Sequence, residues 1–489
     1  MSEQLPYFLD SDESSKNAYT ELFQKTNEIL RNSFTKNSAY TGLEPQELSD
    51  KIKNIEILPQ NGKGTEKVFD EITKNVIPNF LRTSSNEYLA HLHGPSLLES
   101  LVAENILNVF NQSMDSWDQS PVATEIELAT IKMLTKLFGY SENADGCFTS
   151  GGSQSNLTGI LMARDWFCKK IGHDVKKHGL PQNYAKFRLY TSEISHFSMD
   201  KACHLLGLGY DAAVKVPVTA QKKIDIQTLS DYIKKDINSG NIPFCIVATI
   251  GTTDFGSIDD ICALKKIADK FGLYLHADAA YGSGLIMSQK YRERAGDFSL
   301  CDSITVDFHK MFLQPISCSA ILVRDSELFS PLELHADYLN REEDEEDGYT
   351  NLVGKSIQTT RRFDAFKVWV SFQTRGKNGF EKIINTCIEN ADYTYTKLKE
   401  NKNFEVLLKP ELSAVVFRAI PKNNLKSKEI DELNKKVRRQ LLHKEGIVIG
   451  QTVNEGKTFL KFTLLNPNLT TKKIDSILDT ILNLACQIA

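Results

Sequence analysis

In the middle of the chain, short runs of apolar residues alternate with segments whose apolar positions recur at helical spacing. Residues 244–250 (FCIVATI) are one such run and indicate a buried strand. Asp259 and Asp260 can cap the helix that follows, which Gly272 can end. Residues 273–277 (LYLHA) supply the next strand. The alternation is typical of a mostly parallel sheet covered by helices. Further strands are predicted at residues 303–306 and 320–323.

The two ends of the chain have different patterns. The N-terminal part is polar with apolar positions at helical spacing, which predicts a helical segment over residues 1–85. Helical patterns also dominate beyond residue 375, followed by strand-like runs at residues 414–417 and 458–464. We therefore expect the N-terminal helical segment to be followed by a large α/β domain (86–375) and a small C-terminal α+β domain (376–489).

Length and composition restrict the class of protein. With 489 residues, 41% of them hydrophobic and 25% charged, the chain can bury two or three cores. A net charge of −5 does not suggest a nucleic-acid or membrane partner, and a small molecule is the expected one. There is no run of roughly 20 apolar residues and no apolar signal core, so a cytoplasmic location is expected. The nine cysteines lack C-x-x-C spacing, which argues against disulfides or a structural zinc site.

Three polar clusters follow predicted strands, where ligands bind in open α/β sheets. The first is residues 149–156 (TSGGSQSN), at the start of a predicted helix. Glycines and hydroxyls there expose backbone N–H groups to the positive end of the helix dipole, which suits a phosphate. The segment matches neither G-x-G-x-x-G nor a P-loop, which disfavours a nucleotide fold. The alternative is a solvent-exposed turn with a serine cap.

The second and third clusters supply an acid and a base. Asp278, in residues 276–284 (HADAAYGSG), follows a buried strand and needs a cationic partner such as a protonated pyridine nitrogen. The alternative is an aspartate that caps a turn. Lys310 ends residues 302–310 (DSITVDFHK) beside His309, where it can lose its proton and form a Schiff base. An isolated lysine at this place would more often lie on the surface.

The order of the three clusters resembles the fold-type I decarboxylases that depend on pyridoxal 5′-phosphate (PLP), in the glutamate, aromatic amino acid and diaminobutyrate group. The resemblance includes residues 111–121 (NQSMDSWDQSP), 303–310 (SITVDFHK) and 359–367 (TTRRFDAFK), and these look closest to L-2,4-diaminobutyrate decarboxylases and siderophore-pathway diamine-forming relatives. It implies a mostly parallel seven-stranded sheet in the large domain and a homodimer with the active site at the subunit interface. It also implies that L-2,4-diaminobutyrate is decarboxylated to 1,3-diaminopropane.

The same resemblance implies roles for individual residues. Lys310 would hold PLP as an aldimine, Asp278 would contact the pyridine nitrogen and His196 would stack on the ring. Without the three clusters, His196 would be interpreted as an ordinary core histidine. Asp307 stands where relatives often have asparagine, which places an acid close to the phosphate. The other implied contacts are Ala280 on the opposite face of the ring, Gly152, Ser153 and His309 at the phosphate, and Thr253 near the ring hydroxyl.

On the substrate side the resemblance implies that Tyr338 returns a proton to Cα from a mobile loop. It precedes the acidic run at residues 341–347 (REEDEED), which indicates a solvated loop. The alternative for Tyr338 is a packed aromatic residue at the base of that loop. Asp118 would bind the distal ammonium of the substrate from the partner subunit, or else cap the following helix. His93 is interpreted as a substrate-side residue.

Two further pairs of residues carry side chains that could bind a ligand. His91 and His93 lack a third ligand at suitable spacing, so no metal is expected. Arg361 and Arg362 are interpreted as braces of the site or of a domain junction.

Other functions stay in competition. A related decarboxylase could act on lysine, ornithine, glutamate or an aromatic amino acid. An aminotransferase or carbon–sulfur lyase on the same fold is disfavoured by the His309–Lys310 pair and the Tyr338 loop. A non-catalytic relative is disfavoured because every expected cofactor residue type is present.

Overall fold

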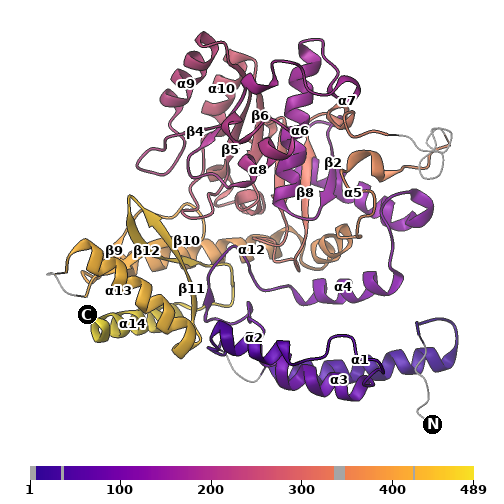
Figure 1. Cartoon of the computed structure of the whole chain (residues 1–489), viewed down its shortest axis with the longest axis vertical. Helices are drawn as coiled ribbons and strands as arrows, with labels where there is room; N and C mark the ends of the chain where they lie inside the picture. Colours follow the sequence, from indigo (N-terminus) through magenta and orange to yellow (C-terminus); the bar gives the residue numbers. More distant parts are fainter. Residues whose placement is uncertain (1–6, 35–37, 335–346, 422–424) are drawn as a thin grey trace. The chain divides into compact units, whose positions relative to one another are not determined.

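The computed structural model describes residues 7–34, 38–334, 347–421 and 425–489 (Figure 1). Tyr338 and most of the acidic run, residues 341–346, therefore lie outside the described residues. Within the described residues, no helix is both long enough and apolar enough to cross a membrane.

A seven-stranded sheet forms the centre of the large part of the chain. Every neighbouring pair of strands is parallel except the two pairs that involve β8. The predicted mostly parallel seven-stranded sheet is thereby confirmed. The strands, in their spatial order, are β2 (Asp145–Thr149), β8 (Ser319–Val323), β7 (Ser303–Asp307), β6 (Tyr274–Asp278), β5 (Ile242–Thr249), β3 (Phe187–Ser192) and β4 (Ala213–Val216).

Helices cover both faces of this sheet. Successive side chains of a strand point to opposite faces, and every residue of the central strands β6 and β7 is buried, so neither face is open to solvent there. Helix α6 (Gly152–Lys170) packs against β5, β6, β7 and β8. Helices α9 (Ile226–Asn238) and α10 (Ile261–Phe271) contact each other and lie beside β4 to β6 (Figure 1). The remaining helices of this part are α4 (Leu98–Phe110), α5 (Pro121–Leu137), α7 (Val175–His178), α8 (Ser198–Leu205) and α12 (Ala365–Glu400).

Helix α10 begins and ends as the sequence predicts. The Asp260 side chain accepts a hydrogen bond from the Ala263 N–H, and Gly272 ends the helix with a φ of 68°, a conformation that favours glycine. Asp259 does not cap this helix. Its buried carboxylate accepts hydrogen bonds from two backbone N–H groups, of Ile224 and Thr249, and burial raises its pKa to about 6.

The N-terminal and C-terminal segments contain the remaining elements. The predicted strands at residues 414–417 and 458–464 are present, as β10 and β12. A five-stranded sheet has the order β1 (Tyr88–Leu89), β11 (Val448–Asn454), β12 (Lys457–Thr463), β10 (Ala414–Ala419) and β9 (Phe404–Val406). The helices are α1 (Glu13–Ser33), α2 (Pro45–Lys53), α3 (Thr65–Glu71), α13 (Ser427–Gln440) and α14 (Thr471–Ile488).

The contacts divide the chain into two compact units rather than three consecutive segments. One contains residues 1–91, 418–460 and 468–489, and the other contains residues 92–417 and 461–467. The N-terminal segment groups with the C-terminal residues because β1 pairs in parallel with β11. The expected boundary at residue 375 lies within α12, where Gly376 interrupts the helix with a φ of 59°.

Candidate active site

A cavity of about 420 Å³ lies within the larger unit, at the carboxyl ends of the parallel strands β5, β6 and β7. All of the predicted cofactor-binding residues line it, although they come from five separate segments. They are Gly152, Ser153, His196, Thr253, Asp278, Ala280, His309 and Lys310. A larger hollow of about 540 Å³, beside α7, contains none of them.

Lys310 reaches the cavity from the turn after β7. Its side chain is 18% exposed, and its Nζ lies 3.1 Å from Oδ2 of Asp307. Nε2 of His309 lies 3.5 Å from the same oxygen. A primary amine and an imidazole thus share one buried carboxylate at the end of the strand.

Asp307 faces the start of helix α6. A Cβ atom added at Gly152 would lie 2.8 Å from the Asp307 carboxylate, so the close approach requires glycine at residue 152. The carboxylate thereby stands where the phosphate was predicted, at the positive end of the helix dipole. Asparagine there could donate a hydrogen bond to a phosphate, whereas aspartate can only accept one.

Buried hydroxyl groups support the first turn of α6. Thr149 Oγ1 lies 2.7 Å from Ser155 Oγ, which lies 2.9 Å from Ser319 Oγ on β8. Gln154 accepts hydrogen bonds from the Ser150 N–H and hydroxyl group at 2.9 and 2.6 Å. These contacts hold the segment that presents Gly152 and Ser153 to the cavity.

Asp278 is a buried carboxylate at the end of β6. Its Oδ2 accepts a hydrogen bond from the Asn156 amide at 3.1 Å, and its Oδ1 accepts one from the Ala280 N–H at 3.2 Å. Among the described residues, no lysine, arginine or histidine nitrogen lies within 4.0 Å of it. Because a buried carboxylate needs a positive partner, this environment suits a protonated ring nitrogen.

Asn156 connects Asp278 with His196, a role that was not predicted from the sequence. Besides Asp278, its amide donates to the Ser198 hydroxyl at 2.9 Å, and Ser198 Oγ lies 2.8 Å from Nδ1 of His196. Residue 156 lies one helical turn after Gly152, on the same face of α6, and this spacing was the available signal.

His196 lies on the cavity wall in its neutral form. Burial lowers its pKa, and nearby Lys310 also lowers it, while the carboxylate of Asp278 partly opposes both. A neutral, flat imidazole is compatible with the predicted stacking on a cofactor ring.

Behind the cavity, His276 is fully buried and neutral. Its Nε2 lies 3.0 Å from Asn156 Oδ1 and its Nδ1 lies 2.8 Å from Ser303 Oγ. Burial lowers its pKa from 6.5 to about 3. The unfolded chain takes up this proton below pH 6.5, whereas the folded chain does not until about pH 3, so stability falls as the pH drops through that range.

We expect the substitution His276→Gln to remove this acid sensitivity. Between about pH 7 and about pH 5, the single histidine should account for about 2 kcal/mol of lost unfolding free energy. Urea unfolding of wild type and variant at both pH values measures the difference. His204→Gln, an exposed histidine on α8, is the control. Equal pH dependence of wild type and His276→Gln would contradict the prediction.

The predicted substrate-side residues do not line this cavity. Leu92 lines it but His93 does not, although burial and, to a smaller extent, nearby His309 lower the pKa of His93. Asp118 is exposed in a short turn, where its carboxylate accepts a hydrogen bond from the Ser116 hydroxyl. Tyr338 lies outside the described residues.

Neither arginine of the TTRRFDAFK segment lines the cavity. Arg361 is buried, forms an ion pair with Glu127 at 2.9 Å and donates to the Phe148 carbonyl group. Arg362 forms ion pairs with Glu104 and Asp364. Among the described residues, no three potential metal ligands form a group that could hold a metal ion.

The cavity lining offers several unpartnered hydrogen-bonding atoms to a polar ligand. Three of its buried polar atoms, Gln154 Nε2, Thr249 Oγ1 and Asp307 Oδ1, have no hydrogen-bond partner among the described residues. Leaving such an atom unsatisfied costs about 1–3 kcal/mol, which a bound polar ligand would recover. Gln154 Nε2 and Thr249 Oγ1, together with the amine of Lys310 and the carboxylate of Asp278, match donors and acceptors that PLP requires. Asp307 Oδ1 can only accept a hydrogen bond and does not suit a phosphate oxygen.

Comparison with known proteins yields a consistent set of similarities. A family profile described as the pyridoxal-dependent decarboxylase conserved domain matches residues 45–420. The chain is 37% identical over 435 residues to an L-2,4-diaminobutyrate decarboxylase from Acinetobacter baumannii, covering 86% of this chain and 84% of the relative. It is 34% identical over 474 residues to one from Rhizobium meliloti (strain 1021), covering 97% and 93%.

A solved structure is similar over nearly its whole length. It is the glutamate decarboxylase domain of diaminobutyrate-pyruvate transaminase and L-2,4-diaminobutyrate decarboxylase from Vibrio parahaemolyticus. The TM-score is 0.90 at 36% sequence identity, and the match covers 98% of each chain.

Proposed function

We propose a function from one premise, which is that the chain belongs to the pyridoxal-dependent decarboxylase family. On that premise, it decarboxylates L-2,4-diaminobutyrate to 1,3-diaminopropane and carbon dioxide. Family membership makes the chain a PLP-dependent carboxy-lyase. The choice of substrate is supported by two relatives of that name at 34–37% identity over most of the chain.

One observation carries the assignment of chemistry to this cavity: a lysine amine and a buried carboxylate without a cationic partner among the described residues both line it. Lys310 would anchor the cofactor aldehyde, and Asp278 would hold the ring nitrogen protonated. Ser153, on the first turn of α6, would bind the phosphate. When bound, PLP withdraws electrons from the bond to the departing carboxyl group.

A substrate panel tests the proposal. The purified enzyme, loaded with PLP, is given L-2,4-diaminobutyrate, ornithine, lysine, glutamate and an aromatic amino acid, and carbon dioxide release is measured. We expect the highest kcat/KM for diaminobutyrate. Absence of release from every basic amino acid would overturn the proposed substrate class. Formation of keto acid without carbon dioxide would instead indicate an aminotransferase.

The proposed enzyme is a homodimer with its active site at the subunit interface. Helix α4 supports this, because one of its faces exposes a stripe of apolar side chains, as expected of a surface that a second copy covers. The exposed residues are Leu98, Leu101, Val102, Ile106, Val109 and Phe110. Sedimentation of the PLP-loaded enzyme should give twice the chain mass. The variant Val102→Glu should sediment with a lower mass, because the new charge weakens the contact between the two copies. A fully active monomer would refute the dimer.

Asp118 is proposed to bind the distal ammonium of a substrate in the partner subunit. It is exposed and does not line the cavity of its own subunit, which supports a role in the partner's. The same panel, run on Asp118→Asn, should show a raised KM for diaminobutyrate with little change for glutamate. An equal change for both substrates would instead assign Asp118 a structural role, through its hydrogen bond with Ser116; its side chain does not cap α5.

Tyr338 remains the proposed proton donor to Cα, and Tyr338→Phe should lower kcat more than it alters KM.

A cytoplasmic location is also proposed, supported by the nine cysteines, all of which are free. Cell fractionation checks it.

A further inference from the structure

The loop of residues 314–318 forms part of the cavity wall. Ile316 and Ser317 line the cavity next to His309 and Lys310. At the start of the loop, the buried side chain of Gln314 bonds to Ser100 on α4 at 2.8 Å and to Ser371 on α12 at 3.0 Å. The 314–318 loop therefore joins the cavity to the helix pair α4 and α12.

Lys367, in the first turn of α12, binds this loop. Its side chain is completely buried. Its Nζ donates hydrogen bonds to two carbonyl groups of the loop, those of Pro315 at 3.0 Å and Ser317 at 3.1 Å. The backbone carbonyls on both sides of residue 316 thus converge on one ammonium group.

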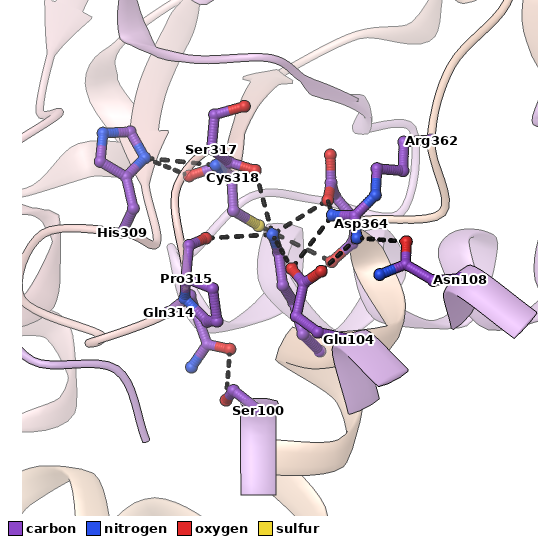
Figure 2. Close-up of polar contacts among 11 residues, drawn as sticks. Ser100, Glu104, Asn108, His309, Gln314, Pro315, Ser317, Cys318, Arg362 and Asp364 are labelled. Atoms are coloured by element: carbon purple, nitrogen blue, oxygen red, sulfur yellow. Dashed lines mark hydrogen bonds and ion pairs between the residues drawn. The ribbon is translucent and has the colours of Figure 1, made fainter. Parts of the chain in front are cut away.

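The charge of Lys367 is balanced by carboxylates on two sides. Its Nζ lies 2.8 Å from Glu104 on α4 and 3.0 Å from Asp364, and Arg362 pairs with both carboxylates (Figure 2). Burial alone would lower the pKa of Lys367, but Cys318, Asp364 and Glu104 outweigh it and raise that pKa above its ordinary value. Lys367 therefore stays charged. Two cations and two carboxylates make the cluster neutral.

At the other end of the loop, Cys318 holds His309. Nδ1 of His309 lies 2.8 Å from the carbonyl oxygen of Cys318 (Figure 2). The Phe308 N–H donates to the same oxygen at 3.0 Å. The Cys318 thiol in turn contacts the Asp364 carbonyl group at 3.7 Å. The charged cluster is thus connected to His309 through residues 315–318 of the loop.

We propose that Lys367 is a positioning residue for the cofactor, and that its buried ammonium holds the 314–318 loop in the conformation that places His309 at the cavity. Without this ammonium, the carbonyls of Pro315 and Ser317 would face the Glu104 and Asp364 carboxylates with no donor between them, and the loop would move. The inference rests on the proposed role of His309 at the cofactor phosphate.

A simpler role for Lys367 would be to fasten α4 to α12. Another pair already does this, because Arg375 on α12 forms an ion pair with Glu99 on α4. Within the described part of the chain, that pair makes no hydrogen bond to the 314–318 loop. Arg375→Met is therefore a matched control, since it removes one cation and one α4–α12 ion pair but leaves the loop carbonyls bound.

The test is the affinity for PLP, measured by titrating the cofactor-free enzyme and following its fluorescence and the visible absorption of the bound cofactor. Lys367→Met keeps the length of the side chain and removes its charge. We expect its dissociation constant for PLP to rise about 10- to 100-fold, as when residues that orient metal ligands are replaced. Arg375→Met should bind PLP as the wild type does.

A double variant separates positioning from stability. Lys367→Met with Glu104→Leu removes one cation and one carboxylate without adding a donor, so the cluster stays neutral while the two loop carbonyls still lack their donor. Its thermal stability should recover towards wild type, and its PLP affinity should stay low. If Lys367→Met alone does not fold, the PLP affinity of the double variant tests the inference in its place.

Three results would overturn the inference: wild-type PLP affinity in Lys367→Met, recovery of affinity in the double variant, or an equal loss in Arg375→Met. Each of these requires that the wild type binds PLP. Failure of the wild type to bind PLP would instead refute the proposed function.

Discussion

Replacing Lys310 by alanine is expected to lower kcat for carbon dioxide release by at least about 10³-fold, within the range found when covalent catalytic groups are removed. Lys310 is the lysine that lines the cavity, and its amine lies 3.1 Å from Asp307. Without that amine, the cofactor aldehyde has no covalent anchor. The cofactor would then be held only by hydrogen bonds and ring contacts, and the substrate amine would have no lysine linkage to exchange with.

The measurement combines activity with spectroscopy. Steady-state carbon dioxide release gives kcat, and the visible absorption band of the lysine-linked cofactor should disappear in Lys310→Ala. Lys201→Ala is the matched control, because Lys201 is an exposed lysine on α8 near His196 and does not line the cavity. Retention of the absorption band in Lys310→Ala would show that another amine carries the cofactor.

The parts of the site that the sequence predicts are those set by local patterns. Lys310 and Asp278 each follow a run of apolar residues that becomes a buried strand, and parallel strands bring their carboxyl ends to the same edge. Asp260 caps α10 because its side chain needs only an N–H three residues ahead. Neighbouring Asp259 could not be distinguished from it, because its partners lie on other segments.

Contacts between distant segments explain what the sequence does not reveal. Lys367 contacts Glu104, which lies 263 positions away in the sequence, and the Pro315 carbonyl group, which lies 52 positions away. β1 groups with the C-terminal residues because Tyr88 pairs with Val448. A hydrophobic pattern identifies a strand or a helix but not the partner across the fold, so neither the 314–318 loop nor the composition of the two units could be predicted.

Replacing Asp278 by alanine is expected to have the second largest effect. The substitution leaves a protonated ring nitrogen in a buried site without its carboxylate. Breaking a buried ion pair costs about 3–5 kcal/mol, or between about a hundredfold and several thousandfold in kcat. The ring nitrogen would lose its proton, and with it the electron withdrawal that loss of the carboxyl group requires. Carbon dioxide release at saturating PLP measures the effect.

Two further variants distinguish the charge of Asp278 from its shape. Asp278→Asn keeps the size of the side chain and can still bond to Asn156, so near-wild-type activity in that variant would contradict a need for the negative charge. Cofactor methylated at the ring nitrogen carries a permanent positive charge that does not depend on a carboxylate. It should restore part of the activity of Asp278→Ala. Asn156→Ala removes the amide that bonds to Asp278 but leaves the Asp278 carboxylate in place. It should therefore lose less activity than Asp278→Ala, because the carboxylate is still present and only its orientation changes.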